Sequence, residues 1–319
     1  MKNIFFSLFL LCSTAAAQYS LSVQNIGGAV TAKDKNSVRV TLLHNGAEVR
    51  TIERTLPFDV PFPSTSIDEA SGTFVLIYAF DGFAEVYGAD GGKRWEKNFF
   101  KGMSPNYERT LTAAIGATGI VFLTSDVRQD RALVHRYALS GRKEWERALP
   151  YAMGYEIAMS SDERTVAAGS YSVNEGTVRR AATVMNKIGS VEGESSILFR
   201  HAAFQTDGAM LALSSEKEIV LYDVMQKKEI ERTERSGSGI ITDIRWDGST
   251  LHTIEAAVIT SPTGPVTLQS PVLHTYDMTL RHTSARPLSD GAYRRIIFRT
   301  TAQGPAVSLD DRMIPVREQ

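Results

Sequence analysis

The sequence predicts an all-β protein, a single closed β-propeller of six or seven four-stranded blades, with seven favoured. The first observation is an internal repeat, because residues 79–99 (AFDGFAEVYGADGGKRWEKNF) return as residues 131–149 (RALVHRYALSGRKEWERAL). The repeat places Trp95 and Trp145 50 positions apart. The second observation is that short Val, Ile, Thr and aromatic runs alternate with Gly, Asp and Asn turns, without helical periodicity. Such runs are typical of β-strands.

The N-terminal segment has the three regions of a secretory signal peptide. A basic start precedes an apolar run over residues 4–12 and small residues at 15–17. The apolar run is too short to span a bilayer, which disfavours an uncleaved anchor, and Leu11 is too large to precede a lipidated Cys12. We therefore expect a signal peptide over residues 1–17, a propeller domain over residues 18–319, and an exported protein that is either periplasmic or extracellular.

Composition excludes several classes of function. The chain has 35 Lys and Arg, 36 Asp and Glu, and one Cys, which lies inside the expected signal peptide. The mature chain would hold itself together by core burial, with neither disulfides nor thiolate chemistry. Its near-neutral charge argues against nucleic acid as a partner. No later apolar run is long enough for a membrane span, and we expect a monomer.

Seven repeat units can be traced along the chain. They begin near Tyr19, Ser64, Arg109, Tyr155, Arg200, Gly239 and Tyr293. The fifth unit, residues 199–234, is the clearest, since polar turns such as residues 206–208 separate four short strands. The last unit has three strands before the chain ends, so we expect residues 19–23 to complete that blade and close the ring. The first unit is then assembled from residues 29–56, where strands are hard to count, so a ring of six blades remains an alternative to seven.

The fifth unit also carries a family resemblance. Its Thr206-Asp207-Gly208 turn, the strand Ile219 to Asp223 and the basic turn that follows resemble the blades of WD-repeat and quinoprotein-like propellers. In the latter, a Trp after a Gly-Lys turn docks on the neighbouring blade, and Trp95 and Trp145 match that position. The resemblance implies that both are structural blade-docking residues. Quinoprotein dehydrogenases place adjacent cysteines against their cofactor, and the mature chain has none, so we expect no cofactor.

A candidate ligand site follows from the starts of several units. There an aromatic residue precedes charged ones, as in Tyr107-Glu108-Arg109 and Tyr293-Arg294-Arg295. Innermost strands line the central channel of a propeller, and the loops that lead into them form one face of the ring. The predicted ligand-binding residues are Arg109, Tyr155, Glu156, Arg200, His201 and Arg294. In the competing interpretation, the aromatics pack between blades and the charges pair with one another at the rim.

Catalytic motifs do not emerge from the sequence. There is no G-x-S-x-G and no phosphate-binding loop, and the six His residues are scattered, so we predict neither catalytic nor metal-binding residues. The favoured function is a non-enzymatic scaffold that binds a protein or peptide partner, and the Arg residues of the candidate site would favour an acidic one. The alternative is a propeller hydrolase or lyase of the lactonase type with its site in the channel.

Overall fold

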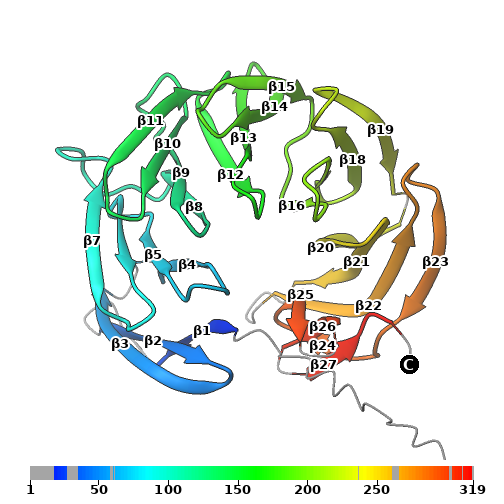
Figure 1. Ribbon diagram of the computed structural model, residues 1–319, viewed down its shortest axis with the longest axis horizontal. Coiled ribbons are helices and arrows are strands. Elements are labelled where there is room, and N and C mark those ends of the chain that lie inside the picture. The colour runs from blue at the N-terminus through cyan, green and yellow to red at the C-terminus, as the bar shows by residue number, and fades with distance from the viewer. Residues whose placement is uncertain are drawn as a thin grey trace, which may run out of the picture.

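The computed structural model shows an all-β, seven-bladed propeller, as the sequence predicts (Figure 1). It describes residues 18–26, 35–57, 60, 62–235, 237–260, 266–301, 304–310 and 312–317. The expected signal peptide, residues 1–17, lies outside the described residues. In the part that is described, every regular element is a strand, and no helix is long and apolar enough to cross a membrane.

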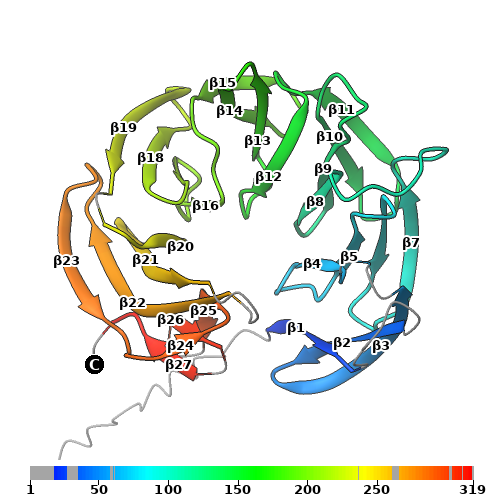
Figure 2. The ribbon, with the colours of Figure 1, turned by 180° about the vertical axis from the view of Figure 1, so that it is seen from behind.

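Each blade is one antiparallel sheet, and the chain visits the blades in order around the ring (Figures 1 and 2). The first blade contains β1 (Tyr19–Asn25), β2 (Lys35–His44) and β3 (Ala47–Pro57). The second contains β4 (Ser64–Ile67), β5 (Phe74–Tyr78), β6 (Phe83–Tyr87) and β7 (Lys93–Asn98). The third contains β8 (Thr110–Ile115), β9 (Gly119–Ser125), β10 (Leu133–Ala138) and β11 (Lys143–Ala148). The fourth contains β12 (Met153–Met159), β13 (Thr165–Asn174), β14 (Thr177–Asn186) and β15 (Val191–Ser195).

The remaining blades follow the same plan. The fifth contains β16 (His201–Phe204), β17 (Met210–Ser214), β18 (Glu218–Asp223) and β19 (Lys228–Glu234), which confirms the four strands predicted for this unit. The sixth contains β20 (Ile240–Asp247), β21 (Thr250–Ile259), β22 (Thr267–Tyr276) and β23 (His282–Pro287), and the short β24 (Ala292–Tyr293) also pairs with β22. The seventh contains β25 (Ile296–Thr301), β26 (Gly304–Leu309) and β27 (Arg312–Pro315).

A recurrent β-bulge identifies the strand positions in the first blade. In blades two to six, the bulge interrupts the pairing of the third strand with the fourth. The pairing of β2 with β3 carries the same bulge, between Leu42 and Leu43. Because bulges mark defined positions in a sheet, β2 and β3 are the third and fourth strands of their blade. β1, which pairs with β2, is therefore the second strand, and the described residues hold no innermost strand in the first blade.

The predicted closure of the ring is wrong. Residues 19–23 do not complete the last blade, because they pair with β2 in register from Tyr19 opposite His44. The physical reason is packing: Tyr19 and Leu21 lie against the core that the first blade shares with the second. The seventh blade ends at β27, its third strand in the described part of the chain.

Apolar side chains fill six of the interfaces between neighbouring blades. One core cluster joins each adjacent pair from blades one and two to blades six and seven. Blades seven and one also lie next to each other (Figure 1), but among the described residues no core cluster joins them. We call this seventh interface the seam.

Candidate functional site

Two long hairpins rise on the face of the ring where the innermost strands begin. β12 starts with Met153 opposite Tyr171, so residues 172–179 of the β13–β14 hairpin extend past it. In blade six, Ile240 lies opposite Ala256, so the following part of β21 and the start of β22 also extend. Blade five has only the short turn 215–217 at this end. Blade five is therefore low between two taller neighbours.

A hollow of about 490 Å³ lies on this face, between blades four and five. We call it the saddle. Its walls come from blade four and from the turn and strand ends of blade five. They are formed by Tyr155, Arg180, Leu198, Arg200, Ser215, Glu216, Lys217, Glu218 and Glu234.

The charges of the saddle are balanced. Three cations, Arg180, Arg200 and Lys217, stand beside three carboxylates, Glu216, Glu218 and Glu234. The Arg200 guanidinium pairs with Glu216 at 2.7 Å, and that of Arg180 pairs with Glu218 at 3.0 Å. Both Arg side chains are about 40% exposed, at 43% and 40%. The saddle therefore presents both signs of charge to a ligand, in pairs that water can reach.

The hairpin of blade four adds exposed apolar side chains above the saddle. Val173 pairs with Val178 near its tip, and the two are 64% and 55% exposed. Tyr171 pairs with Arg180 two positions below, so these residues share one face of the hairpin. Because Arg180 reaches Glu218 of blade five, this face, with its two valines, is turned toward blade five.

Two of the predicted ligand-binding residues, Tyr155 and Arg200, line the saddle together. Their neighbours, Glu156 and His201, make other contacts. Glu156 accepts a hydrogen bond from the Thr112 hydroxyl of blade three at 3.4 Å and one from the Ile157 N–H at 2.9 Å. Burial raises the pKa of Glu156.

His201 lies 4.0 Å from Asp243 of blade six, measured from Nδ1 to Oδ1. Burial, with help from Arg200, lowers the pKa of His201 to about 4. Asp243 accepts the backbone N–H groups of Phe298 at 2.7 Å and Ile244 at 2.8 Å. Burial nevertheless raises the pKa of this carboxyl to about 6. Sequence reasoning missed Asp243, and the signal that could have found it is an acidic residue in the middle of an innermost strand, between Ile241 and Ile244.

Arg109 lies outside the saddle, which corrects its predicted place in a shared ligand site. Its side chain is fully buried and pairs with the equally buried Asp126 at 3.2 Å. It also donates to the carbonyls of Phe80 and Ser104, and the Phe100 ring lies 4.2 Å away. Because Phe80 belongs to blade two and Asp126 to blade three, Arg109 links these two blades. Its guanidinium is buried and bonded within the protein, and is not accessible to a ligand.

Arg294 also lies outside the saddle, on the seventh blade. Its side chain is exposed, and its backbone N–H donates to Asp310 in the same blade. The three Arg residues predicted to converge therefore contribute one guanidinium to the saddle, that of Arg200. Arg109 lies at the interface of blades two and three, and Arg294 is exposed on blade seven.

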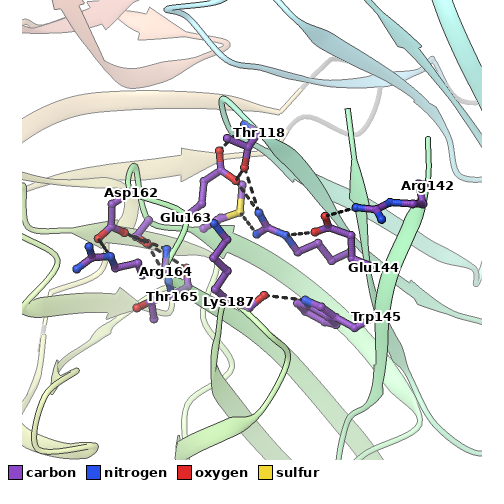
Figure 3. Close-up of polar contacts among 12 residues, drawn as sticks. Thr118, Arg142, Glu144, Trp145, Asp162, Glu163, Arg164, Thr165 and Lys187 are labelled. Carbon is purple, nitrogen blue, oxygen red and sulfur yellow. Dashed lines mark hydrogen bonds and ion pairs between the residues drawn. The ribbon is translucent and has the colours of Figure 1, made fainter. Parts of the chain in front are cut away.

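Both predicted docking residues contact the next blade. Trp95 donates its indole N–H to the Leu139 carbonyl at 2.9 Å, and Trp145 donates to the Lys187 carbonyl at 2.8 Å (Figure 3). Each indole lies over a glycine with positive φ, Gly141 or Gly189. The two Trp side chains are half-buried. Their contribution to stability stays a prediction.

Within the described ranges, no three His, Cys, Asp or Glu side chains gather as they would around a metal ion.

Comparisons with known proteins show the fold alone. No family model matches the chain, and no curated protein matches it. A chain of the mitotic checkpoint complex crystal structure is similar with a TM-score of 0.58 at 10% identity, over 91% of this chain and 88% of that one. The Dos1 propeller is similar with a TM-score of 0.60 at 9% identity, over 85% and 69%. The chain is thus similar in fold to solved propeller structures over most of its length.

Proposed function

We propose that the protein is an exported, non-enzymatic scaffold that holds a protein or peptide partner in the saddle. The observation that carries the proposal is the pair of exposed valines, Val173 and Val178, near the tip of a hairpin that projects beside a polar hollow. Contiguous exposed apolar side chains mark interaction surfaces in many proteins, and the two valines supply such a contact beside the charged groups of the saddle. Loops on one face of a rigid ring are also where propellers carry their binding residues.

The chemistry of the saddle favours a peptide over a simple anion. A peptide offers carboxylates to Arg180, Arg200 and Lys217, cationic groups to the glutamates, and an apolar side chain to Val173 and Val178. Exposed ion pairs contribute little, about 0 to 1 kcal/mol each, so a partner can exchange them at low cost. The balanced charge does not support the strong preference for acidic ligands that three converging Arg residues would have given.

The alternative, a hydrolase or lyase of the lactonase type, would have to use Glu156, His201 and Asp243. Asp243 already accepts two backbone N–H groups, one of them from the next blade. It therefore serves the junction of blades six and seven, and we do not propose a catalytic role for it.

A capture experiment with matched variants tests the proposal. Immobilised protein would be incubated with envelope extract, and the proteins retained would be measured by mass spectrometry. The saddle variant is Arg200→Gln with Lys217→Gln. The control is Arg164→Gln with Lys187→Gln, which removes two cations from the turns at the opposite ends of the strands.

A partner retained by the wild type and the control but lost by the saddle variant would support the proposal. Equal retention by all three proteins would contradict it. A tightly held divalent metal in the isolated protein would instead favour the hydrolase. Export is tested separately by the mass of the mature chain, which should begin at Gln18.

A further inference from the structure

β1 has an edge that no described strand covers. It pairs with β2 on one side, and no strand of the described residues pairs with it on the other. The ladder includes the Ile26 N–H bonded to the Ser37 carbonyl, so the even-numbered residues of β1 bond to β2. The backbone groups of Leu21 and Val23 therefore point away from β2, toward the centre of the ring. This is the edge along which the innermost strand pairs in other blades.

The neighbouring innermost strand is unusually exposed where it begins. Ser64 and Thr65 of β4 are exposed, whereas Thr110 and Leu111 of β8 are half-buried and buried. Val23 on β1 is 41% exposed. A strand paired along β1 would cover Val23 of β1 and also Ser64 and Thr65 of β4. The first blade thus presents the backbone groups that pair with an innermost strand in other blades.

The wall on the side of blade seven is basic. Ile296 and Phe298 of β25 pack toward blade six, so Ile297 and Arg299 project to the opposite side, toward the first blade. Arg295 directly precedes β25 and is exposed. Arg299 meets Glu69 at 4.0 Å. Arg295 forms no ion pair in the described part of the chain, although Asp243 of blade six is near enough to act on its charge. Partial burial and the nearby Arg299 lower the pKa of Arg295, while Asp243 raises it, and the net pKa is lowered. Arg299 thus adds positive charge beside Arg295 that Asp243 only partly offsets.

The carboxylate nearest to Arg299, that of Glu69, already has another partner. Glu69 also accepts a hydrogen bond from the Gln18 side chain at 2.6 Å, and its carbonyl accepts the Tyr19 N–H at 2.9 Å. Glu69 therefore anchors the start of β1 and neutralises Arg299 from a distance only. A ligand with carboxylates would relieve the repulsion between Arg295 and Arg299.

We propose that the inner edge of β1 is a strand-acceptor site for an extended acidic peptide of a partner protein. The peptide becomes the innermost strand of the first blade. Its backbone bonds to Leu21 and Val23, and its carboxylates face Arg295 and Arg299. Strand addition of this kind gives affinity through the main chain and specificity through alternate side chains. The site is separate from the saddle and does not depend on the function proposed for it.

The test uses the purified chain and a short fluorescein-labelled peptide of alternating Glu and Val, with a Lys and Val peptide as its control. Fluorescence anisotropy should show saturable binding of the Glu peptide only. The variant Arg295→Gln with Arg299→Gln should bind it about tenfold more weakly, as expected for the loss of charge-assisted bonds. The saddle variant Arg200→Gln with Lys217→Gln should bind it as the wild type does. Equal binding of both peptides, or equal binding by the Arg295 and Arg299 variant, overturns the proposal.

Backbone pairing is tested apart from charge. Val23→Pro removes an N–H that points into the site and spares the ladder with β2, so it should abolish binding. In the unmodified protein, the Leu21 and Val23 amides should exchange more slowly once the peptide is bound. Unchanged exchange overturns strand addition even if Val23→Pro fails to fold.

Two further outcomes would also overturn the assignment to a partner protein. If a chain that retains residues 1–17 refuses the peptide while the shorter chain binds it, those residues occupy the site. If light scattering shows dimers that the peptide dissociates, a second copy occupies it.

Discussion

The interface between blades three and four and the seam between blades seven and one each contain an Arg–Glu ion pair. The first pair is buried and the second is exposed to solvent. At the first, Arg136 is 1% exposed and pairs with Glu163 at 2.6 Å, while an apolar cluster fills the space beside it. At the seam, Arg39 of the first blade pairs with Glu53 at 2.7 Å, but the two side chains are 42% and 54% exposed. The distances hardly differ. Solvent decides what each pair contributes.

The difference teaches how this ring is held together. Glu163 accepts hydrogen bonds from the backbone and side chain of Thr118 in blade three, both at 2.6 Å (Figure 3). It therefore joins two blades in surroundings where an unpaired charge would be costly. Arg39 and Glu53 lie on adjacent strands of a single blade and join nothing else. The ring is fastened at its six filled interfaces and is weakest at the seam.

The largest expected effect is that of Glu163→Ala. Removal of one partner of a buried ion pair leaves the other charge uncompensated, which typically costs about 3 to 5 kcal/mol. We expect the lower end of that range, because Arg136 keeps a second partner in Glu144 at 2.9 Å. Urea denaturation should show a lower midpoint with an unchanged slope. A loss in unfolding free energy below about 1 kcal/mol would show that the pair does not fasten these blades.

Trp145→Ala should have the next largest effect. The substitution removes a half-buried indole and its bond to Lys187, so we expect a loss of about 2 to 3 kcal/mol in unfolding free energy, less than for a fully buried Trp. Partner capture by the folded protein should be unchanged. Lost binding with unchanged stability would make Trp145 a ligand contact instead.

Two glycines give a matched control for the docking of Trp145. Gly189 and Gly176 have φ of +77° and +78°, but a Cβ on Gly189 would meet the Trp145 ring at 2.8 Å, whereas one on Gly176 would meet nothing within 4 Å. The strain of alanine at positive φ is common to both sites. Gly189→Ala should therefore cost more than Gly176→Ala, and equal costs would mean that the indole moves aside freely.

The pH dependence should distinguish Glu163 from Asp243. Burial raises the pKa of Glu163, but hydrogen bonds from Thr118 and Arg136 outweigh it, and the net pKa is lowered. Its stabilisation is present above its unfolded pKa and is lost as pH falls through the folded value. The pKa of Asp243 is raised from 3.8 to about 6, so its contribution is present below the unfolded pKa and is lost as pH rises through about 6.

Asp243→Asn should therefore flatten the part of the stability curve between the unfolded and folded pKa values of Asp243. Two pKa units correspond to about 2.7 kcal/mol at most, and we expect about 2 kcal/mol because the side chain keeps some access to water. Denaturant midpoints of wild type and variant at pH 4, 5, 6 and 7 would measure the effect. Parallel curves would show that Asp243 titrates normally.

Much of the fold could be predicted from the sequence, because blades repeat locally. The starts of β1, β4 and β20 fall within one residue of the predicted unit starts, since Asp-Gly and Asn-Gly turns with apolar runs signal strand ends directly. The position of β1 within its blade could not be predicted. Its alternating pattern suits any strand, and only the bulge between β2 and β3 shows which strand it is.

The candidate site could be predicted only in part. Arg109 and Arg200 occupy the same place in the repeat. Arg109 is nevertheless buried with Asp126, whereas Arg200 pairs with Glu216 at the solvent-exposed surface. The difference arises in loops from other blades, whose conformations the repeat does not specify. Tyr155 and Arg200 could be predicted because both lie where their strands begin, on the face of the ring that carries the saddle. The height of the flanking hairpins depends on pairing registers, which a single sequence leaves open.

The smallest expected effect is that of Arg39→Ala at the seam. An exposed pair of this kind contributes about 0.2 to 1 kcal/mol, and removal of one partner leaves Glu53 free to be solvated. We expect a change below about 0.5 kcal/mol in unfolding free energy, and a still smaller one at high salt, where screening weakens exposed charges. Side-by-side urea titrations with Glu163→Ala would measure both. A cost at the seam as large as that at the interface of blades three and four would mean that Arg39 takes part in closing the ring.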